Sequence, residues 1–72
     1  MPEFVLVSYP RVRDVFIDGR RSGRTNELLT VIRGTQTFDL GTPGDYTPSN
    51  VQTLVADTTN DAPCEITFQP KS

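Results

Sequence analysis

The chain contains no histidine and no tryptophan, and it has a single cysteine among its 72 residues. Histidine is the commonest general base and metal ligand near neutral pH. Its absence excludes Ser-His and Cys-His catalytic pairs and histidine-containing zinc sites within this chain. A single cysteine excludes an intramolecular disulfide, and we expect Cys64 to be a small buried hydrophobic residue. These absences argue against an enzyme, and we expect neither a cofactor nor a bound metal.

Long hydrophobic runs are also absent. The longest run of apolar residues is Phe4 to Val7, whereas a membrane-spanning helix needs about 18 or more. The first residues, MPEFVLVSYP, lack the basic segment and the apolar core of a signal peptide. We therefore expect no membrane span and no signal peptide in this chain, with the cytoplasm as the default compartment. The sequence leaves open whether the chain is a free-standing protein or one domain of a larger one.

Charge is low overall but unevenly distributed. The formal net charge is −2, which argues against nucleic acid as the main partner. The first 33 residues contain six arginines and four acidic residues and so carry +2, while the remainder has five acidic residues and Lys71 and so carries −4. Our main interpretation is a solvated, salt-bridged surface. The alternative is weak polyanion binding, which would use Arg11, Arg13, Arg20, Arg21, Arg24 and Arg33.

The clearest local signal is the stretch VFIDGRRSG, residues 15–23. Asp18-Gly19 after an alternating run predicts a hairpin with a type I′ turn, because both turn positions need positive φ. A two-residue loop would pair Ile17 with Arg20, Phe16 with Arg21, and Val15 with Ser22. Val15 and Ile17 then face the core, and Arg21 lies on the Phe16 side, where its guanidinium would stack on the ring.

We predict further strands at residues 4–8, which form a short apolar run, and at residues 28–32, 35–40, 51–56 and 64–68. Alternation places Phe38 and Leu40 on one face of the segment 35–40, and it buries Cys64, Ile66 and Phe68 in the segment 64–68. The segments 28–32 and 35–40 flank Arg33-Gly34, and we predict that they form a second hairpin. As an alternative to β structure at its start, the segment after Arg24 could form a single helical turn through Leu29, capped by Thr25 or Asn26. Residues 69–72 are expected to fray.

Loops separate these segments. The longest, residues 41–50, has Tyr46 as its only large side chain. We expect this ring to fold over the core edge with its hydroxyl in water, and ligand stacking is the alternative. Asp57, Asn60 and Asp61 have no calcium-loop spacing, and turn formation explains them better.

About seven short strands, with turn signals every 8–12 residues, predict an all-β fold. The arrangement expected is a small antiparallel β-sandwich of about six to seven strands. At this length there is room for one domain, residues 1–72, with a core spanning about residues 4–68.

Several short motifs follow one another along the chain. They are Ser8-Tyr9-Pro10, Val15-Phe16-Ile17-Asp18-Gly19, Gly23 with Thr25, Leu29, Ile32, Gly34-Thr35, Phe38, Leu40, and Pro43-Gly44 with Tyr46. In this order the chain, from Phe4 to Phe68, resembles the PEGA domain family. The family's Pro-x-Gly-Ala segment is replaced here by Pro10-Arg11-Val12-Arg13-Asp14. Asn26 stands where the family usually has proline, and Asp45 is inserted before Tyr46.

The resemblance implies an immunoglobulin- or prealbumin-like sandwich without catalytic residues. Such bacterial domains are regarded as binding or structural modules near the cell envelope, and the family defines no functional residues to transfer. We therefore expect a non-catalytic module that makes protein or glycan contacts. The candidate surface residues are Phe16, Arg20, Arg21 and Tyr46. An exposed edge strand offers a further route to a partner, by β-augmentation or homodimerisation. The alternative function is a small self-assembling structural subunit, of a phage particle or a surface layer.

Overall fold

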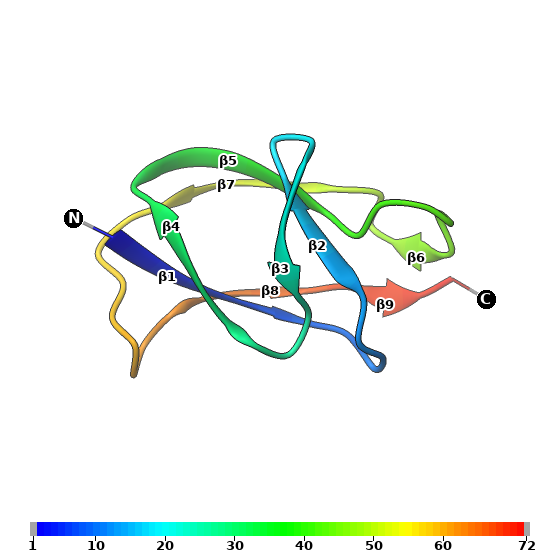
Figure 1. Cartoon of the computed structure of the whole chain (residues 1–72), viewed down its shortest axis with the longest axis horizontal. Coiled ribbons are helices and arrows are strands. Elements are labelled where there is room, and N and C mark those ends of the chain that lie inside the picture. The colour runs from blue at the N-terminus through cyan, green and yellow to red at the C-terminus, as the bar shows by residue number, and fades with distance from the viewer. Residues whose placement is uncertain (1, 72) are drawn as a thin grey trace.

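The computed structural model describes residues 2–71, and these residues form β-strands and loops without any helix (Figure 1). The described residues accordingly include no helix able to cross a membrane. The strands are β1 (Pro2–Ser8), β2 (Asp14–Ile17), β3 (Arg20–Arg24), β4 (Leu28–Ile32), β5 (Gly34–Asp39), β6 (Tyr46–Thr47), β7 (Val51–Val55), β8 (Cys64–Thr67) and β9 (Gln69–Pro70).

Two main sheets form the layers of a small β-sandwich. One has the strand order β4-β1-β8 and the other the order β3-β2-β5-β7, while β6 and β9 form a separate two-stranded ribbon. In Figure 1, β5 and β7 run along the upper side of the molecule and β1 and β8 along the lower side. The predicted all-β sandwich is confirmed. Strand pairs are antiparallel except β1 with β8, which run parallel.

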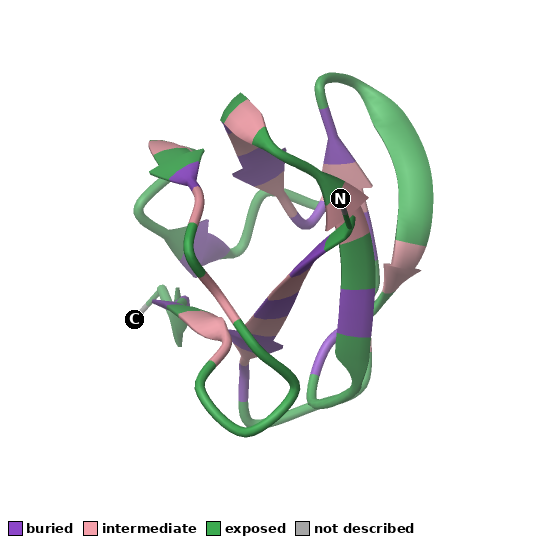
Figure 2. Cartoon of the chain, turned by 90° about the vertical axis from the view of Figure 1, so that its left-hand side faces the viewer, coloured by how far each residue is buried: buried purple, intermediate pink, exposed green. Residues whose placement is uncertain are grey.

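The core lies between the two sheets and is built from alternate residues of the strands (Figure 2). The predicted inward faces are confirmed, since Val15 and Phe38 are fully buried and Phe68 is 1 % exposed. The buried apolar residues are Val5, Val7, Tyr9, Val15, Ile17, Leu29, Phe38, Leu40, Tyr46, Val55, Ile66 and Phe68. Cys64 packs against this cluster but is only half-buried, and burial raises the pKa of its thiol.

The β2–β3 hairpin follows the prediction up to a bulge. Asp18 and Gly19 have φ of 52° and 83°, and Ile17 pairs with Arg20 and Phe16 with Arg21. The register then shifts, so that Val15 pairs with Gly23 instead of Ser22, and that part of the prediction is wrong. A Cβ on residue 23 would lie 2.4 Å from Leu29 Cδ2. The bulge therefore places at this position the one residue type that lets Leu29 pack against β3.

The predicted second hairpin is wrong. Strand β4 pairs with β1, whereas β5 pairs with β2 and β7, so the chain changes sheets at Arg33-Gly34. Gly34 has φ of 141°, a conformation that other residues rarely adopt, and it enables this change of direction. Alternation alone marks strands and their faces but does not identify their partners.

Thr25 and Asn26 do not cap a helical turn. Their side chains instead join the two connections that lead from one sheet to the other, β1–β2 and β3–β4. The Thr25 hydroxyl donates to the Arg11 carbonyl at 2.7 Å and accepts from the Arg13 amide at 2.9 Å. The Asn26 side chain accepts from the Tyr9 amide at 3.1 Å and donates to the Tyr9 carbonyl at 2.7 Å. The β3–β4 connection thus holds the β1–β2 connection, residues 9–13.

Another threonine fastens the β7–β8 connection to β1. The Glu3 carboxylate, on a residue only 6 % exposed, accepts from the Thr58 hydroxyl at 2.6 Å and from its amide at 2.9 Å. The same hydroxyl accepts from the Phe4 amide at 2.7 Å. The bonds from the hydroxyl and then the amide of Thr58 hold the pKa of Glu3 below its usual value.

The C-terminal segment is paired, and the expectation that it frays is wrong for the residues described. Strand β9 pairs with β6, and the Lys71 amide donates to the Asp45 carbonyl at 2.8 Å. These bonds attach residues 69–71 to the loop that contains Tyr46. Residue 72 lies outside the described residues.

Candidate interaction surface

The structure brings together only two of the four predicted surface residues. Phe16 and Arg21 are cross-strand partners on the outer face of the β3-β2-β5-β7 sheet. Arg20 pairs with Ile17, so it belongs to the inward face and lines a separate hollow between β3 and β4. Tyr46 is 7 % exposed. Arg20 and Tyr46 therefore do not belong to one surface with Phe16.

Phe16 is half-buried because its ring lies against the backbone of Gly41. A Cβ at position 41 would lie 2.5 Å from Phe16 Cε1, and Gly41 has φ of 71°. The Gly41 amide donates to Asp39 Oδ1 at 2.8 Å, which fixes the backbone under the ring. One face of Phe16 is thus held by the protein while the ring stays partly accessible.

Arg21 pairs with Asp14 and does not stack on Phe16. Its Nε lies 3.1 Å from Asp14 Oδ1, and both side chains are about half exposed, at 54 % and 47 %. The stacking prediction is wrong because the carboxylate on the same face offers the guanidinium a nearer partner. An exposed pair of this kind contributes at most about 1 kcal/mol, so its effect is mainly to orient Arg21.

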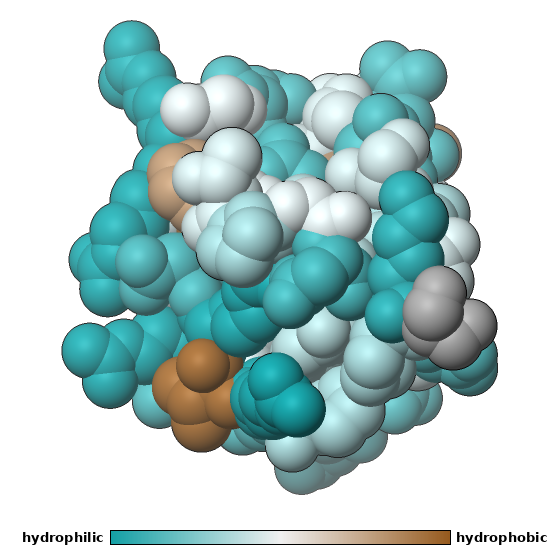
Figure 3. Space-filling view, turned by 90° about the vertical axis from the view of Figure 1, so that its right-hand side faces the viewer, coloured by the Kyte–Doolittle hydropathy of each residue, from teal (hydrophilic) through white to brown (hydrophobic). Residues whose placement is uncertain are grey.

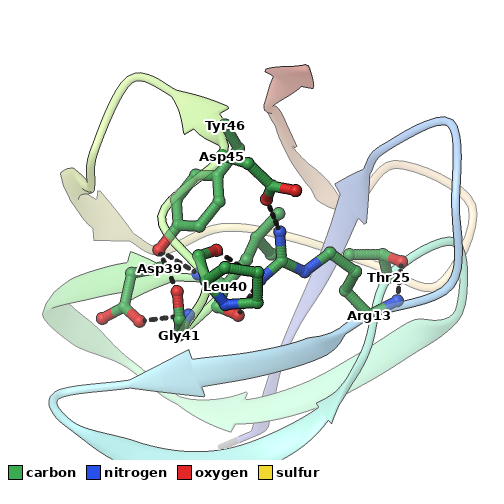
Figure 4. Close-up of polar contacts among 8 residues, drawn as sticks. Arg13, Thr25, Asp39, Leu40, Gly41, Asp45 and Tyr46 are labelled. Atoms are coloured by element: carbon green, nitrogen blue, oxygen red, sulfur yellow. Dashed lines mark hydrogen bonds and ion pairs between the residues drawn. The ribbon is translucent and has the colours of Figure 1, made fainter. Parts of the chain in front are cut away.

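Arg13, which the sequence marks only as one of six candidate polyanion-binding arginines, organises the loop that follows β5 (Figure 4). Its guanidinium forms an ion pair with Asp45 and donates to the carbonyls of Pro43 at 2.7 Å and Leu40 at 3.3 Å. Only 14 % of the side chain is exposed. An arginine in a polar connection has no sequence feature that singles it out, because its partners are far away along the chain.

Tyr46 completes this arrangement from the loop side. The Arg13 guanidinium carbon lies 5.0 Å from the centre of the Tyr46 ring, which meets Phe68 edge-on at 89°. The Tyr46 hydroxyl accepts from the Leu40 amide at 3.1 Å and donates to the Gly41 carbonyl at 2.9 Å. The expectation of a hydroxyl in water is wrong, and the ring is not available for ligand stacking. We refer to Arg13 and Tyr46 as the Arg13–Tyr46 clamp.

An open hollow of about 460 Å³ lies between β2 and the β5–β6 loop, which the Arg13–Tyr46 clamp holds. Its lining consists of Val12, Arg13, Asp14, Phe16, Arg24, Leu40, Thr42 and Pro43. Val12 is 64 % exposed, and Arg24 has no ion-pair partner within residues 2–71. The hollow therefore combines apolar groups with one arginine charge that no carboxylate of the described chain neutralises. We call these lining residues together with Arg21 the Phe16 surface.

The end of the molecule that carries β6 and β9 has a different character. Figure 3 shows this end as largely hydrophilic, with one compact hydrophobic group exposed at its lower edge.

Nowhere in the described residues do three or more Cys, Asp or Glu side chains gather as they would around a metal ion. The Phe16 surface is thus one of the described regions where apolar area, an unpaired charge and a hollow coincide.

Comparison of the chain with protein-family models, with curated proteins and with solved structures finds no match. The resemblance to PEGA domains stays a prediction.

Proposed function

We propose that the chain is a non-catalytic β-sandwich module, PEGA-like in kind, that binds a protein or glycan partner through the Phe16 surface. The observation that supports this proposal is the half-exposed Phe16 ring, seated on Gly41 and bordered by Arg24. Phenylalanine and arginine are both enriched at protein interfaces relative to the rest of the protein surface. A hollow that is wide open suits a group presented by another macromolecule better than an enclosed small molecule.

The charges indicate which chemistry would fit. Asp14 is paired with Arg21, and Arg13 with Asp45, which leaves Arg24 as the cation of the Phe16 surface without a carboxylate partner among the described residues. A partner that places an apolar side chain or a sugar face on Phe16, with a carboxylate near Arg24, would match this surface. The same pairing reduces the number of free arginines available to a polyanion, because Arg13 and Arg21 already have acidic partners.

The test compares matched variants of the immobilised protein on a glycan array and in quantitative capture from a cell extract. Phe16→Ala and Arg24→Glu should each reduce retention of a specific ligand at least tenfold. Leu54→Ala is the control, because Leu54 is also an exposed apolar residue, 63 % accessible, but lies on β7 at the other edge of the sheet. The proposal fails if Phe16→Ala retains the same ligands as the wild type, or if no ligand is retained in either format.

A further inference from the structure

Strand β4 has one edge without a partner strand. It is the terminal strand in the order β4-β1-β8. The Phe4 amide donates to Thr58, so it points away from β4, and the Phe4–Thr30 pair is a non-hydrogen-bonded pair of the β1–β4 ladder. Thr30 therefore directs its own N–H and C=O outward, and Leu28 and Ile32 do the same because they alternate with it.

The sequence around this edge is complementary to itself. Residues 27–33 read ELLTVIR. Two copies placed antiparallel about Thr30 would pair Glu27 with Arg33, Leu28 with Ile32, and Leu29 with Val31, and Thr30 would face Thr30. Opposite charges meet at both ends and apolar residues meet between them, which are the favourable cross-strand combinations. This register also pairs Leu28, Thr30 and Ile32 with one another, the residues that direct their backbone groups to the free edge.

A register shift of two residues is the smallest that keeps the outward N–H and C=O groups of the two strands facing one another. Such a shift removes the Glu27–Arg33 pairs. Glu27 would then lie opposite Val31 or Thr35, and neither end would join opposite charges. The arrangement about Thr30 is thus favoured over its neighbours by both ends of the strand.

The faces of the strand agree with the same arrangement. Leu28 and Ile32 point away from the core and are 46 % and 78 % exposed, whereas Leu29 is 8 % exposed. In the pairing about Thr30, each exposed Leu28 would cover an Ile32 of the other copy on the outer face. Inward residues would likewise meet inward residues, so both sandwich cores remain intact. The Ile32 carbonyl already accepts from the Gln36 side chain, and its second lone pair remains for the partner strand.

The hollow between β3 and β4 is lined by two edge strands, and only β3 has features that protect it against pairing with another strand. Strand β3 carries Arg20, Arg21 and Arg24 and contains the bulge at Ser22, features that discourage edge pairing. Strand β4 contains no charged residue, no proline and no bulge in its five residues. An unprotected edge with exposed apolar side chains is suited to pairing with another strand.

We propose that two copies of this chain associate through β4, antiparallel about Thr30, to join their three-stranded sheets into one of six strands. This pairing is independent of ligand binding at the Phe16 surface. The interface is small, and the dimer is therefore expected to be reversible and concentration-dependent.

The first test is sedimentation or light scattering of the whole protein over a wide concentration range. The mass should rise toward twice the monomer mass. Thr30→Lys, which would oppose two like charges at the centre, and Thr30→Pro, which removes the outward N–H, should each weaken dimerisation at least tenfold. Circular dichroism verifies that each variant folds. Leu54→Lys, on the edge strand β7, is the control and should leave dimerisation unchanged.

Charge reversal tests the register itself. Glu27→Arg and Arg33→Glu alone would each place like charges opposite one another, and each should weaken the dimer. The double variant restores opposite charges and should recover most of the wild-type affinity. A monomer at every concentration, a dimer insensitive to Thr30→Lys and Thr30→Pro, or a double variant no better than the singles would overturn the proposal. Phe16→Ala should dimerise normally, so a failure of ligand binding and a failure of dimerisation are told apart.

Discussion

The Arg13 guanidinium lies over the Tyr46 ring, 5.0 Å from its centre, although the two residues belong to segments far apart in the sequence. This contact joins the β1–β2 connection to the loop that follows β5. Thr25 holds the Arg13 backbone from the other side, through the bond between its hydroxyl and the Arg13 amide at 2.9 Å. The wall of the hollow beside Phe16 therefore depends on Thr25 and Tyr46, which do not line the hollow themselves.

Replacing Arg13 by alanine should destabilise the protein by about 2 kcal/mol, because it removes bonds from a charged donor that is largely buried. The Leu40 and Pro43 carbonyls would lose a donor, and Asp45 would lose its ion-pair partner. Urea unfolding of the purified variant measures the change. Arg13→Lys should recover only part of it, since an ammonium cannot reproduce the planar fork. Arg24→Ala is the control, and a loss as large as that of Arg13→Ala would contradict the assignment.

Tyr46→Phe should cost about 1–2 kcal/mol, although it keeps the ring on Phe68 and under Arg13. The change leaves the buried Leu40 amide without its acceptor and the Gly41 carbonyl without its donor. Unfolding experiments measure the loss, and exchange of the Leu40 amide with solvent should accelerate in the variant. If stability and exchange both match the wild type, the hydroxyl has other partners in solution.

The sequence predicted the strands better than their partners. Alternation identified the inward faces of β2 and β5, because burial on one side imposes a period of two. Alternation failed to predict the strand partners at Arg33-Gly34, where a tight reversal leads from one sheet to the other and not to a neighbouring strand of the same sheet. It also failed to predict the bulge at Ser22, which leaves room for Leu29. Both features depend on contacts between layers, and no local pattern encodes such contacts.

The site was predicted less well for the same reason. Cross-strand geometry correctly placed Arg21 beside Phe16, since a two-residue turn fixes the register next to it. Tyr46 was recognised as the large side chain of its loop, but its burial depends on Arg13, which long-range folding brings to it. Polar residues that hold connections, such as Thr25, have the same composition as ordinary turns and give no signal of their own.

Gly41→Ala should be clearly destabilising, by more than about 1 kcal/mol, and should displace Phe16. The new Cβ would lie 2.5 Å from the ring, and the residue has φ of 71°. Gly44→Ala in the same loop is the matched control, because a Cβ there meets nothing within 4 Å and its φ is not positive. Thermal unfolding compares the two variants, and aromatic proton shifts report on Phe16. Equal stability of both variants would show that the Phe16 ring does not rest on Gly41.

Acid should weaken the protein partly through Glu3. Bonds from Thr58 lower the pKa of this carboxyl in the folded protein, so the unfolded chain binds its proton first as the pH falls. The stabilisation is complete above the ordinary glutamate pKa of about 4.3 and is lost as the pH drops through the lower folded value. Unfolding free energies measured from neutral pH to about pH 3 should therefore fall less steeply for Glu3→Gln than for the wild type. In a Thr58→Ala background the effect of Glu3→Gln on this slope should shrink, because the hydroxyl that favours the charged form is gone. Parallel curves for wild type and Glu3→Gln would mean that the Glu3–Thr58 contact does not persist in solution.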